Sequence, residues 1–254
     1  MKPRISIIAR PNIDWLAIER FLDDENTTWK RTKDSTNPEE LIEFSGRICY
    51  MSFGNKQSPR TNQEYIKNLI EQGHESVLEH VNWTFEISNV TRSFTHQLVR
   101  HRIGFSYSQL SQQYVDHSDF EVHSPIDFDN LPKTSQAWDK VQRLIRDSYT
   151  EIVETLDDEL DSGEFESKKE KNRLINSIAR QILPSGTATS LVMTANARAL
   201  RHFLKLRGST QGDMEMRSFC VTLFDLLTKE APAVFFDFKN VTLSDGEEAV
   251  AKGS

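Results

Sequence analysis

The chain has 254 residues, a hydrophobic fraction of 37%, a charged fraction of 27% and a formal net charge of -7. These values are typical of a globular protein with a substantial core, and they argue against a protein whose main task is to grip duplex nucleic acid by its phosphates. The sequence has no apolar run long enough to span a membrane and no signal-peptide pattern, and its cysteines, Cys49 and Cys220, form no disulfide framework, so we expect a cytoplasmic protein.

In chain order, the hydrophobic pattern first predicts a strand over 4–9 and a helix over 14–22. Asn37-Pro38-Glu39-Glu40 is typical of a helix start with Asn37 as its cap, and this helix should run toward Cys49. The following pattern predicts a loop over 55–62, a helix over 63–72 and a strand over 83–87.

The second half of the chain is dominated by helical patterns, which we expect over 90–102, 131–160, 195–207 and 213–230. The charge run over 167–173 is typical of a solvated helix face. Helices with a few separated strands indicate an α+β fold with one domain over 1–240, and the small polar residues of 241–254 predict a flexible tail.

Positive charge is concentrated in two stretches of this acidic chain. Ile87–Val115 and Lys171–Gly212 contain arginines and no Asp or Glu. Converging cations raise the local concentration of an anionic ligand, whereas two solvated basic faces would have the same composition. Charge alone leaves both interpretations open.

Several familiar chemistries are missing from the sequence. The histidines of the segment 74–80 lack zinc-site spacing, and no G-x-G-x-x-G, Walker A or G-x-S-x-G pattern is present. Cys49 and Cys220 have no obvious activating neighbour, so buried structural roles are the default for both. Any phosphate-bearing ligand should therefore be held mainly by side chains on a surface that is not a Rossmann fold.

The most informative segment spans 97–114. Arg100 and Arg102 flank His101, and hydroxyl and amide side chains follow with no acid among them. Arginine offers paired planar donors to phosphates and pyrimidine carbonyls, and Ser and Gln hold ribose, phosphate and base edges. At a helix end the same residues could instead cap the last carbonyl groups. The whole segment favours a ligand site.

This segment resembles the signature of the flavin-dependent thymidylate synthases, which is Arg-His-Arg, seven residues and a serine. Here eight residues separate Arg102 from Ser111, Gly104 looks like the extra residue, and Gln113 stands where the family usually has an arginine. Other segments resemble the family in the same order, namely Arg47–Tyr50, Gly73–His80 with Thr84-Phe85, Arg180–Pro184, Asn196–Arg207 and Ala231-Pro232.

The resemblance implies an α+β fold in which helices pack with a small, mainly antiparallel sheet. It implies methylation of the uracil ring of dUMP to dTMP with FAD, NADPH and methylenetetrahydrofolate, in a homotetramer with shared active sites. A paralogue acting on UMP or another uracil nucleotide is the alternative, motivated by Gly104 and Gln113. A non-catalytic nucleotide- or RNA-binding protein is disfavoured by the acidic net charge.

The resemblance also implies the site residues. Arg207 would polarise a uracil carbonyl, Arg180 would neutralise a phosphate, and the flavin would supply the hydride, so no protein nucleophile is needed. The implied catalytic residues are Arg207, Ser111 and His74. The implied cofactor contacts are Cys49, His74, Arg100, His101, Arg102, Gln109, Asn196 and His202. The implied substrate contacts are Gln97, Arg100, Gln109, Leu110, Ser111, Gln112, Gln113, Arg180 and Arg207.

Helical spacing places Asn196, Phe203 and Arg207 near one stripe, which predicts a site on a rigid helix. Phe203 should itself be a core residue. For Tyr107 and Tyr114, packing in a core or an interface is as good an interpretation as ligand contact.

Overall fold

The computed structural model describes residues 2–115, 117–124, 126, 128–211 and 213–253. The strands are β1 Arg4–Ala9, β2 Asn82–Thr91, β3 Phe105–Gln109, β4 Ala188–Asn196, β5 Phe238–Thr242 and β6 Glu248–Lys252. The helices are α1 Trp15–Asp24, α2 Asn37–Ile48, α3 Asn62–Glu71, α4 Arg92–Leu98, α5 Pro132–Glu159, α6 Lys168–Ala179, α7 Ala197–Arg207 and α8 Met214–Glu230. Short 3-10 turns are η1 Gly54–Lys56, η2 Glu75–His80, η3 Ser162–Glu164 and η4 Arg180–Ile182. None of the helices in the described ranges is long and apolar enough to cross a membrane.

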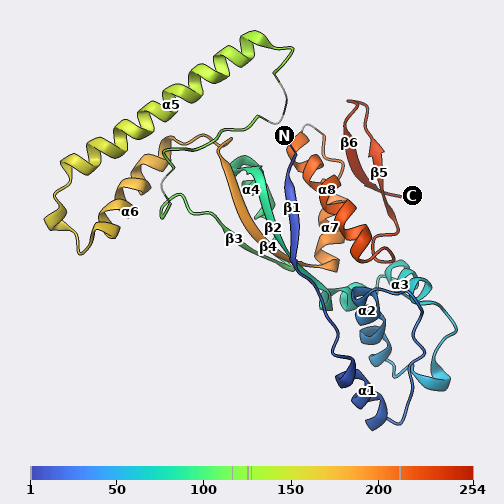
Figure 1. The fold of residues 1–254 in the computed structure, drawn as a ribbon. Coiled ribbons are helices and arrows are strands. Elements are labelled where there is room, and N and C mark those ends of the chain that lie inside the picture. The colour runs from blue at the N-terminus through green and yellow to red at the C-terminus, as the bar shows by residue number, and fades with distance from the viewer. Residues whose placement is uncertain (1, 116, 125, 127, 212, 254) are drawn as a thin grey trace. The chain divides into compact units, whose positions relative to one another are not determined.

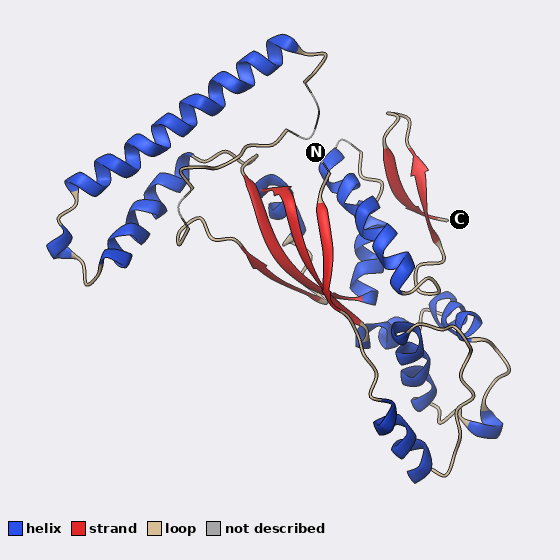
Figure 2. Cartoon of the chain, in the orientation of Figure 1, coloured by secondary structure: helices blue, strands red, loops and turns tan. Residues whose placement is uncertain are grey.

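Two sheets and many helices confirm the α+β class (Figure 2). One sheet has the strand order β1-β2-β4-β3, and β5 pairs with β6 in an antiparallel hairpin. The chain falls into two compact units. The first unit comprises Met1–Arg4, Ile87–Arg100 and Ser108–Leu191, and the second comprises Ile5–Glu86, His101–Tyr107 and Val192–Ser254.

In the first unit, α5 and α6 lie side by side (Figure 1). Tyr149, Phe120 and Ala179 form a small core between these helices and the segment that precedes α5. The charge run that predicted a solvated face is only partly solvated, because Lys171 is buried. Its ammonium donates to the carbonyl oxygen of Asp157 at 2.5 Å and pairs with the Asp157 carboxylate at 3.0 Å. A buried lysine is stable here because both interactions replace water.

In the second unit, α7 packs against α8, and both contact β6 (Figure 2). Phe203, Leu204 and Phe219 are fully buried there, so the core role predicted for Phe203 is confirmed. The prediction for the start of α2 was one residue off. Asn37 is the first helical residue, and Thr36 is the N-cap, whose backbone N–H donates to the Glu39 carboxylate at 3.0 Å.

The boundary between β2 and α4 differs most from the sequence pattern. The expected helix over 90–102 begins only at Arg92, because β2 continues through Val90 and the Thr91 hydroxyl caps α4 by accepting from Phe94 N at 3.0 Å. The helix then ends at Leu98. His101 and Arg102 therefore stand beyond the helix, in the connection to β3, rather than in its last turn.

The expected flexible tail is instead largely strand. β6 pairs along β5, and Ala249 and Val250 are fully buried. Gly246, with a φ of 82°, closes the turn by donating its N–H to Leu243 O at 3.0 Å. Small residues predicted fraying, but the three apolar residues of Glu248-Ala249-Val250-Ala251-Lys252 pair with β5. The adjacent Ala249 and Val250, which point to opposite faces of the strand, are both buried.

Candidate active site

The extra residue of the Arg-His-Arg segment lies in a tight turn of the second unit. Phe105 N donates to Arg102 O at 3.2 Å, and Gly104 adopts a φ of 75°, which favours glycine. A Cβ at Gly104 would lie 2.6 Å from Asn196 Nδ2 and 2.7 Å from Ala199 Cβ, at the start of α7. Asn196 N also donates to Gly104 O at 3.1 Å. The insertion is therefore accommodated by close contact between this turn and α7.

His101 is fixed by α7. Arg207 donates from Nε to His101 Nε2 at 3.2 Å, and the ring of Phe203 lies edge-on to the imidazole at a centroid distance of 4.9 Å. The Tyr107 hydroxyl donates to the His101 carbonyl oxygen at 2.9 Å. Because arginine is always a donor, His101 Nε2 carries a lone pair and the imidazole is neutral, with its proton on Nδ1.

The electrostatic environment of His101 favours this neutral form. Burial is the largest effect that lowers the pKa of His101 below its ordinary value, and the positive charges of Arg207 and His202 lower it further. The histidine is thus available as an acceptor, and through Nδ1 as a donor, without carrying a charge.

The other predicted site residues on or near α7 either cap the helix or are exposed to solvent. Asn196 caps the helix by accepting from Ala199 N at 2.8 Å, while His202 and Arg102 are exposed. For Tyr107 and Tyr114, packing in a core or an interface and ligand contact were equally good interpretations. Tyr114 is 59% exposed in the single chain, which excludes core packing and leaves an interface or a ligand contact open, whereas Tyr107 is half-buried.

Cys49 and His74 lie on other elements of the second unit, and no hydrogen bond in the described ranges joins either to His101 or Arg207. Cys49 is exposed, so the buried role predicted for it is wrong, whereas Cys220 is fully buried as expected. His74 is exposed and directly precedes η2.

The turn that carries Cys49 is stabilised by hydrogen bonds of a buried arginine, Arg47. The buried Arg47 donates to the Glu43 carboxylate at 2.7 Å and to Ser52 O at 3.0 Å, and its guanidinium lies over the Tyr65 ring. Burial of a charged group is tolerated when it is paired and hydrogen-bonded. Arg47, matched to the early family motif, thus shapes this turn rather than lining an open surface.

The first unit carries the amide and hydroxyl residues. Gln109 donates to Thr95 Oγ1 at 2.9 Å, which fixes its amide at the end of β3. Ser111 Oγ accepts from the backbone N–H of Gln113 at 3.2 Å and of Tyr114 at 3.4 Å, so it closes a local turn. Leu110 between them is 39% exposed, and Gln97 and Gln112 are half-buried.

Cations of the first unit include Arg92, Arg100 and Arg180, and no ion pair involves any of them within the described residues. Arg92 donates from Nη2 to Leu110 O at 3.0 Å. Burial is the larger cause that lowers the pKa of Arg92, and the nearby charge of Arg180 is the second. Sequence reasoning placed Arg92 in a basic stretch but did not count it among the site residues.

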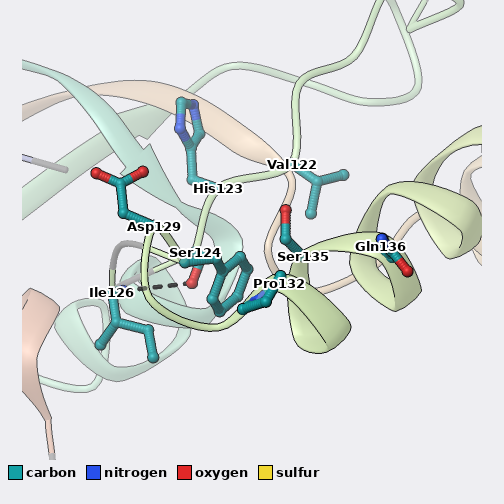
Figure 3. Close-up of a pocket in the computed structure, with 9 residues that line it drawn as sticks. Val122, His123, Ser124, Ile126, Asp129, Pro132, Ser135 and Gln136 are labelled. Atoms are coloured by element: carbon teal, nitrogen blue, oxygen red, sulfur yellow. Dashed lines mark hydrogen bonds between the residues drawn. The ribbon is translucent and has the colours of Figure 1, made fainter.

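A pocket of about 670 Å³ lies elsewhere in the first unit, between the segment after the Val122 bridge and the start of α5 (Figure 3). Its lining contains none of the predicted site residues and includes His123, Ser124, Asp129 and Ser135. The position of this pocket therefore does not indicate where the predicted active-site residues lie.

Each unit, taken by itself, has exposed donors that suit an anionic cofactor such as FAD. Arg100 and Arg102 are exposed and have no carboxylate partner within the described ranges, and the exposed His74 and His202 add further donors. Guanidinium groups bind pyrophosphate oxygens in the absence of a glycine-rich loop. An α+β fold with exposed, unpaired arginines in the described ranges is compatible with a protein that binds an anionic nucleotide.

Comparison with known proteins specifies this class further. A family model described as "Thymidylate synthase complementing protein" matches residues 32–233. The chain is 38% identical over 245 residues to the flavin-dependent thymidylate synthase of Mycobacterium leprae (strain Br4923), covering 95% of both chains. It is 39% identical over 243 residues to that of Mycobacterium avium (strain 104), again over 95% of both, and 38% identical over 237 residues to that of Corynebacterium diphtheriae, over 92% of both. The chain belongs to the flavin-dependent thymidylate synthase family.

Proposed function

We propose that this protein methylates C5 of the uracil ring of dUMP to give dTMP, using FAD, NADPH and methylenetetrahydrofolate. Support comes from relatives named for this activity that match nearly the whole chain. The structural observation that carries the proposal is the Arg207–His101 hydrogen bond, which joins the last residue of α7 to the Arg-His-Arg segment.

Each group of residues has a distinct role in this proposal. Arg207 polarises a uracil carbonyl and stabilises negative charge on the ring as C5 attacks the methylene carbon. When FAD is bound, its reduced form supplies the hydride that completes the methyl group. Arg100, Arg102, His101, His202, Asn196, His74, Cys49 and Gln109 would hold the cofactor. Gln97, Arg100, Gln109, Leu110, Ser111, Gln112, Gln113 and Arg180 would hold the nucleotide, with Ser111 and His74 assisting Arg207.

The alternative substrate, UMP, is not favoured. The relatives that support the family are named as thymidylate synthases. The Gly104 insertion, which motivated the alternative, is taken up in a four-residue turn whose contacts are with Asn196 and Ala199. A local turn of this kind gives no reason to expect a larger sugar pocket.

We further propose a cytoplasmic homotetramer in which residues 1–240 act as one family domain. Support comes from one family model that covers parts of both units, and from apolar side chains left on the surface of the single chain. In the first unit, Leu144 and Val141 on α5 are 63% and 53% exposed, and Leu174 and Ile178 on α6 are also exposed. On each helix the two residues are three or four positions apart and so share a face, and exposed apolar faces of this kind support a surface that another chain covers.

The decisive experiment is anaerobic turnover of the FAD-loaded protein with NADPH and methylenetetrahydrofolate, offering dUMP and UMP in parallel and identifying products by mass. We expect a methylated product from dUMP and little from UMP. A methylated product chiefly from UMP would restore the alternative substrate, and no methylated product from either nucleotide would contradict the proposed reaction.

A further inference from the structure

A pocket of about 430 Å³ lies in the second unit, between the segment that precedes α2 and the segment that precedes α3. Its lining includes Lys30, Arg31 and Arg60, and no Asp or Glu is among the described residues that line it. This is unusual in a chain whose formal net charge is -7. A hollow lined by charges of one sign focuses their field, so this pocket should attract anions.

Hydrogen bonds to the backbone tie the two segments of this pocket together. Gln57 accepts from the backbone N–H of Lys30 with Oε1 at 2.9 Å and donates from Nε2 to Lys30 O at 2.7 Å. The backbone N–H of Asn62 donates to Thr32 Oγ1 at 2.8 Å. The pocket is therefore formed before a ligand binds, which lowers the entropy cost of binding.

Two of the three cations have no anion beside them. Within the described ranges no ion pair involves Lys30 or Arg60, whereas Arg31 contacts the Glu40 carboxylate oxygens at 2.7 and 2.8 Å. Ser58 Oγ accepts from the backbone N–H of Arg60 at 3.3 Å and keeps its own hydrogen to donate. The pocket thus offers an ammonium, a guanidinium and a hydroxyl with two uncompensated positive charges.

Glu64 is the acid nearest to Arg60 in the sequence, but it serves as part of the α3 cap. Its carboxylate accepts from the backbone N–H of Thr61 at 2.8 Å and from the Thr61 hydroxyl at 3.0 Å. These hydrogen bonds are the largest causes that lower the pKa of Glu64, and the charge of Arg60 is a smaller one. An incoming anion therefore does not have to displace this carboxylate from Arg60.

The donors of this pocket favour a phosphate monoester, whose three terminal oxygens accept charge-assisted hydrogen bonds from several directions. In the proposed function, the phosphates of FAD and dUMP are assigned to Arg100, Arg102 and Arg180, which do not line this pocket. The 2′-phosphate of NADPH is then left without donors. It stands at the adenosine end of the dinucleotide, away from the nicotinamide that carries the hydride. A volume of about 430 Å³ suits a ligand of this size rather than a bare anion.

We propose that Lys30, Arg60 and Ser58 bind the 2′-phosphate of NADPH and thereby select NADPH over NADH. The inference rests on the proposed function, because it names where one co-substrate of that reaction binds. Lys30 and Arg60 supply the positive charge, and the Ser58 hydroxyl donates a further hydrogen bond. An NADH molecule lacks the group that these residues recognise.

Calorimetry on the FAD-loaded protein should compare 2′,5′-ADP with 5′-AMP, which lacks the 2′-phosphate, and with inorganic phosphate. We expect 2′,5′-ADP to bind roughly tenfold more tightly than either. The double variant Lys30→Gln, Arg60→Gln should weaken 2′,5′-ADP binding by roughly tenfold, the combined effect of two exposed charge pairs, and should leave 5′-AMP unchanged. Arg20→Gln, which removes an exposed arginine of α1, is the matched control and should change neither.

Anaerobic flavin reduction, followed by absorbance, tests the same site with the whole dinucleotides. The wild-type protein should be half-saturated at a lower concentration of NADPH than of NADH, and the double variant should lose this preference while its value for NADH stays the same.

Three results would overturn the assignment of this pocket. The wild-type protein could bind 2′,5′-ADP and 5′-AMP equally, the double variant could keep the preference for NADPH, or inorganic phosphate could bind as tightly as 2′,5′-ADP, which would indicate a site for free phosphate. Reduction of the flavin by neither dinucleotide would instead overturn the proposed function, so the two failures are distinguishable.

Discussion

The lowered pKa of His101 makes the free energy of unfolding depend on pH. Its folded pKa lies below the ordinary value, so between these two pKa values the unfolded chain binds more protons than the folded chain. The stability that neutral His101 contributes is therefore fully present above the ordinary pKa of about 6.5 and is lost as pH falls through the folded pKa. Protonation at Nε2 would also break the hydrogen bond from Arg207.

Arg207→Gln should raise the pKa of His101 toward its ordinary value, because one of the two neighbouring positive charges is removed while burial remains. The fall in stability below about pH 6.5 should become shallower as a result. A histidine NMR titration measures the first effect, and thermal unfolding at several pH values measures the second.

Lys205→Gln is the control for this prediction, because Lys205 is exposed on the same helix. It should leave the titration of His101 unchanged. A pKa of His101 that stays constant or falls in Arg207→Gln would show that Arg207 does not set the charge state of this histidine.

Gly104→Ala should destabilise the protein more than Gly246→Ala. Both glycines have positive φ, at 75° and 82°, but only the added methyl at Gly104 meets Asn196 and Ala199, whereas nothing lies within 4 Å at Gly246. We expect the difference to be about 1–3 kcal/mol, the usual cost of overpacking, measured by urea unfolding. Equal costs would show that the turn moves away from α7 freely.

At the scale of elements, β6 supports the end of α7. Val250 N donates to Gly208 O at 2.9 Å, directly after Arg207. Arg217 of α8 pairs with Asp245 in the hairpin turn at 2.7 Å. The hairpin therefore holds in place the part of α7 on which the proposed chemistry depends.

Truncation after Leu243 should lower the free energy of unfolding by at least about 2 kcal/mol, since it removes the fully buried Val250 and Ala249. Turnover of dUMP should fall too, because Gly208 loses its partner beside Arg207. Chemical unfolding and steady-state kinetics measure the two effects.

Truncation after Lys252 keeps β6 and serves as the control. Unchanged stability after removal of the whole hairpin would return residues 241–254 to the flexible tail that their composition predicts. Loss of stability with full retention of activity would separate the hairpin from the positioning of Arg207.

The observed bounds of the helices and strands show which elements the hydrophobic pattern predicts and which it misses. The long helices α5, α7 and α8 follow from apolar spacing alone, and the structure places them within about two residues of expectation. β3 and β4 were not predicted, because their small and hydroxyl residues give a weak strand pattern. The end of β2 was missed because Val90 and Thr91 fit both a strand and a helix start.

At the scale of the whole molecule, the exposed apolar surface of α5 and α6 bears on assembly. Leu144→Glu should reduce the tetramer fraction, because a charge would be buried without a partner in the proposed interface. Light scattering should then report species smaller than four chains of 29.3 kDa each. Turnover should fall with it if active sites are shared.

Leu144→Met keeps the apolar surface and is the matched control, for which the mass should not change. A Leu144→Glu protein that retains the wild-type mass would place the interface elsewhere. A smaller mass with full activity would contradict active sites drawn from several subunits.

The sequence by itself determined the family, the α+β class and the residue types of the site, because these depend on local patterns and motif order. Only the tertiary structure decided which residues meet: Arg207 with His101, Gln113 with α6, and Arg201 with Asp237. It also showed that Arg92 donates to Leu110 O, while its buried Nε has no hydrogen-bond acceptor among the described residues. These outcomes depend on contacts between residues 36 to 106 positions apart, which no local pattern encodes.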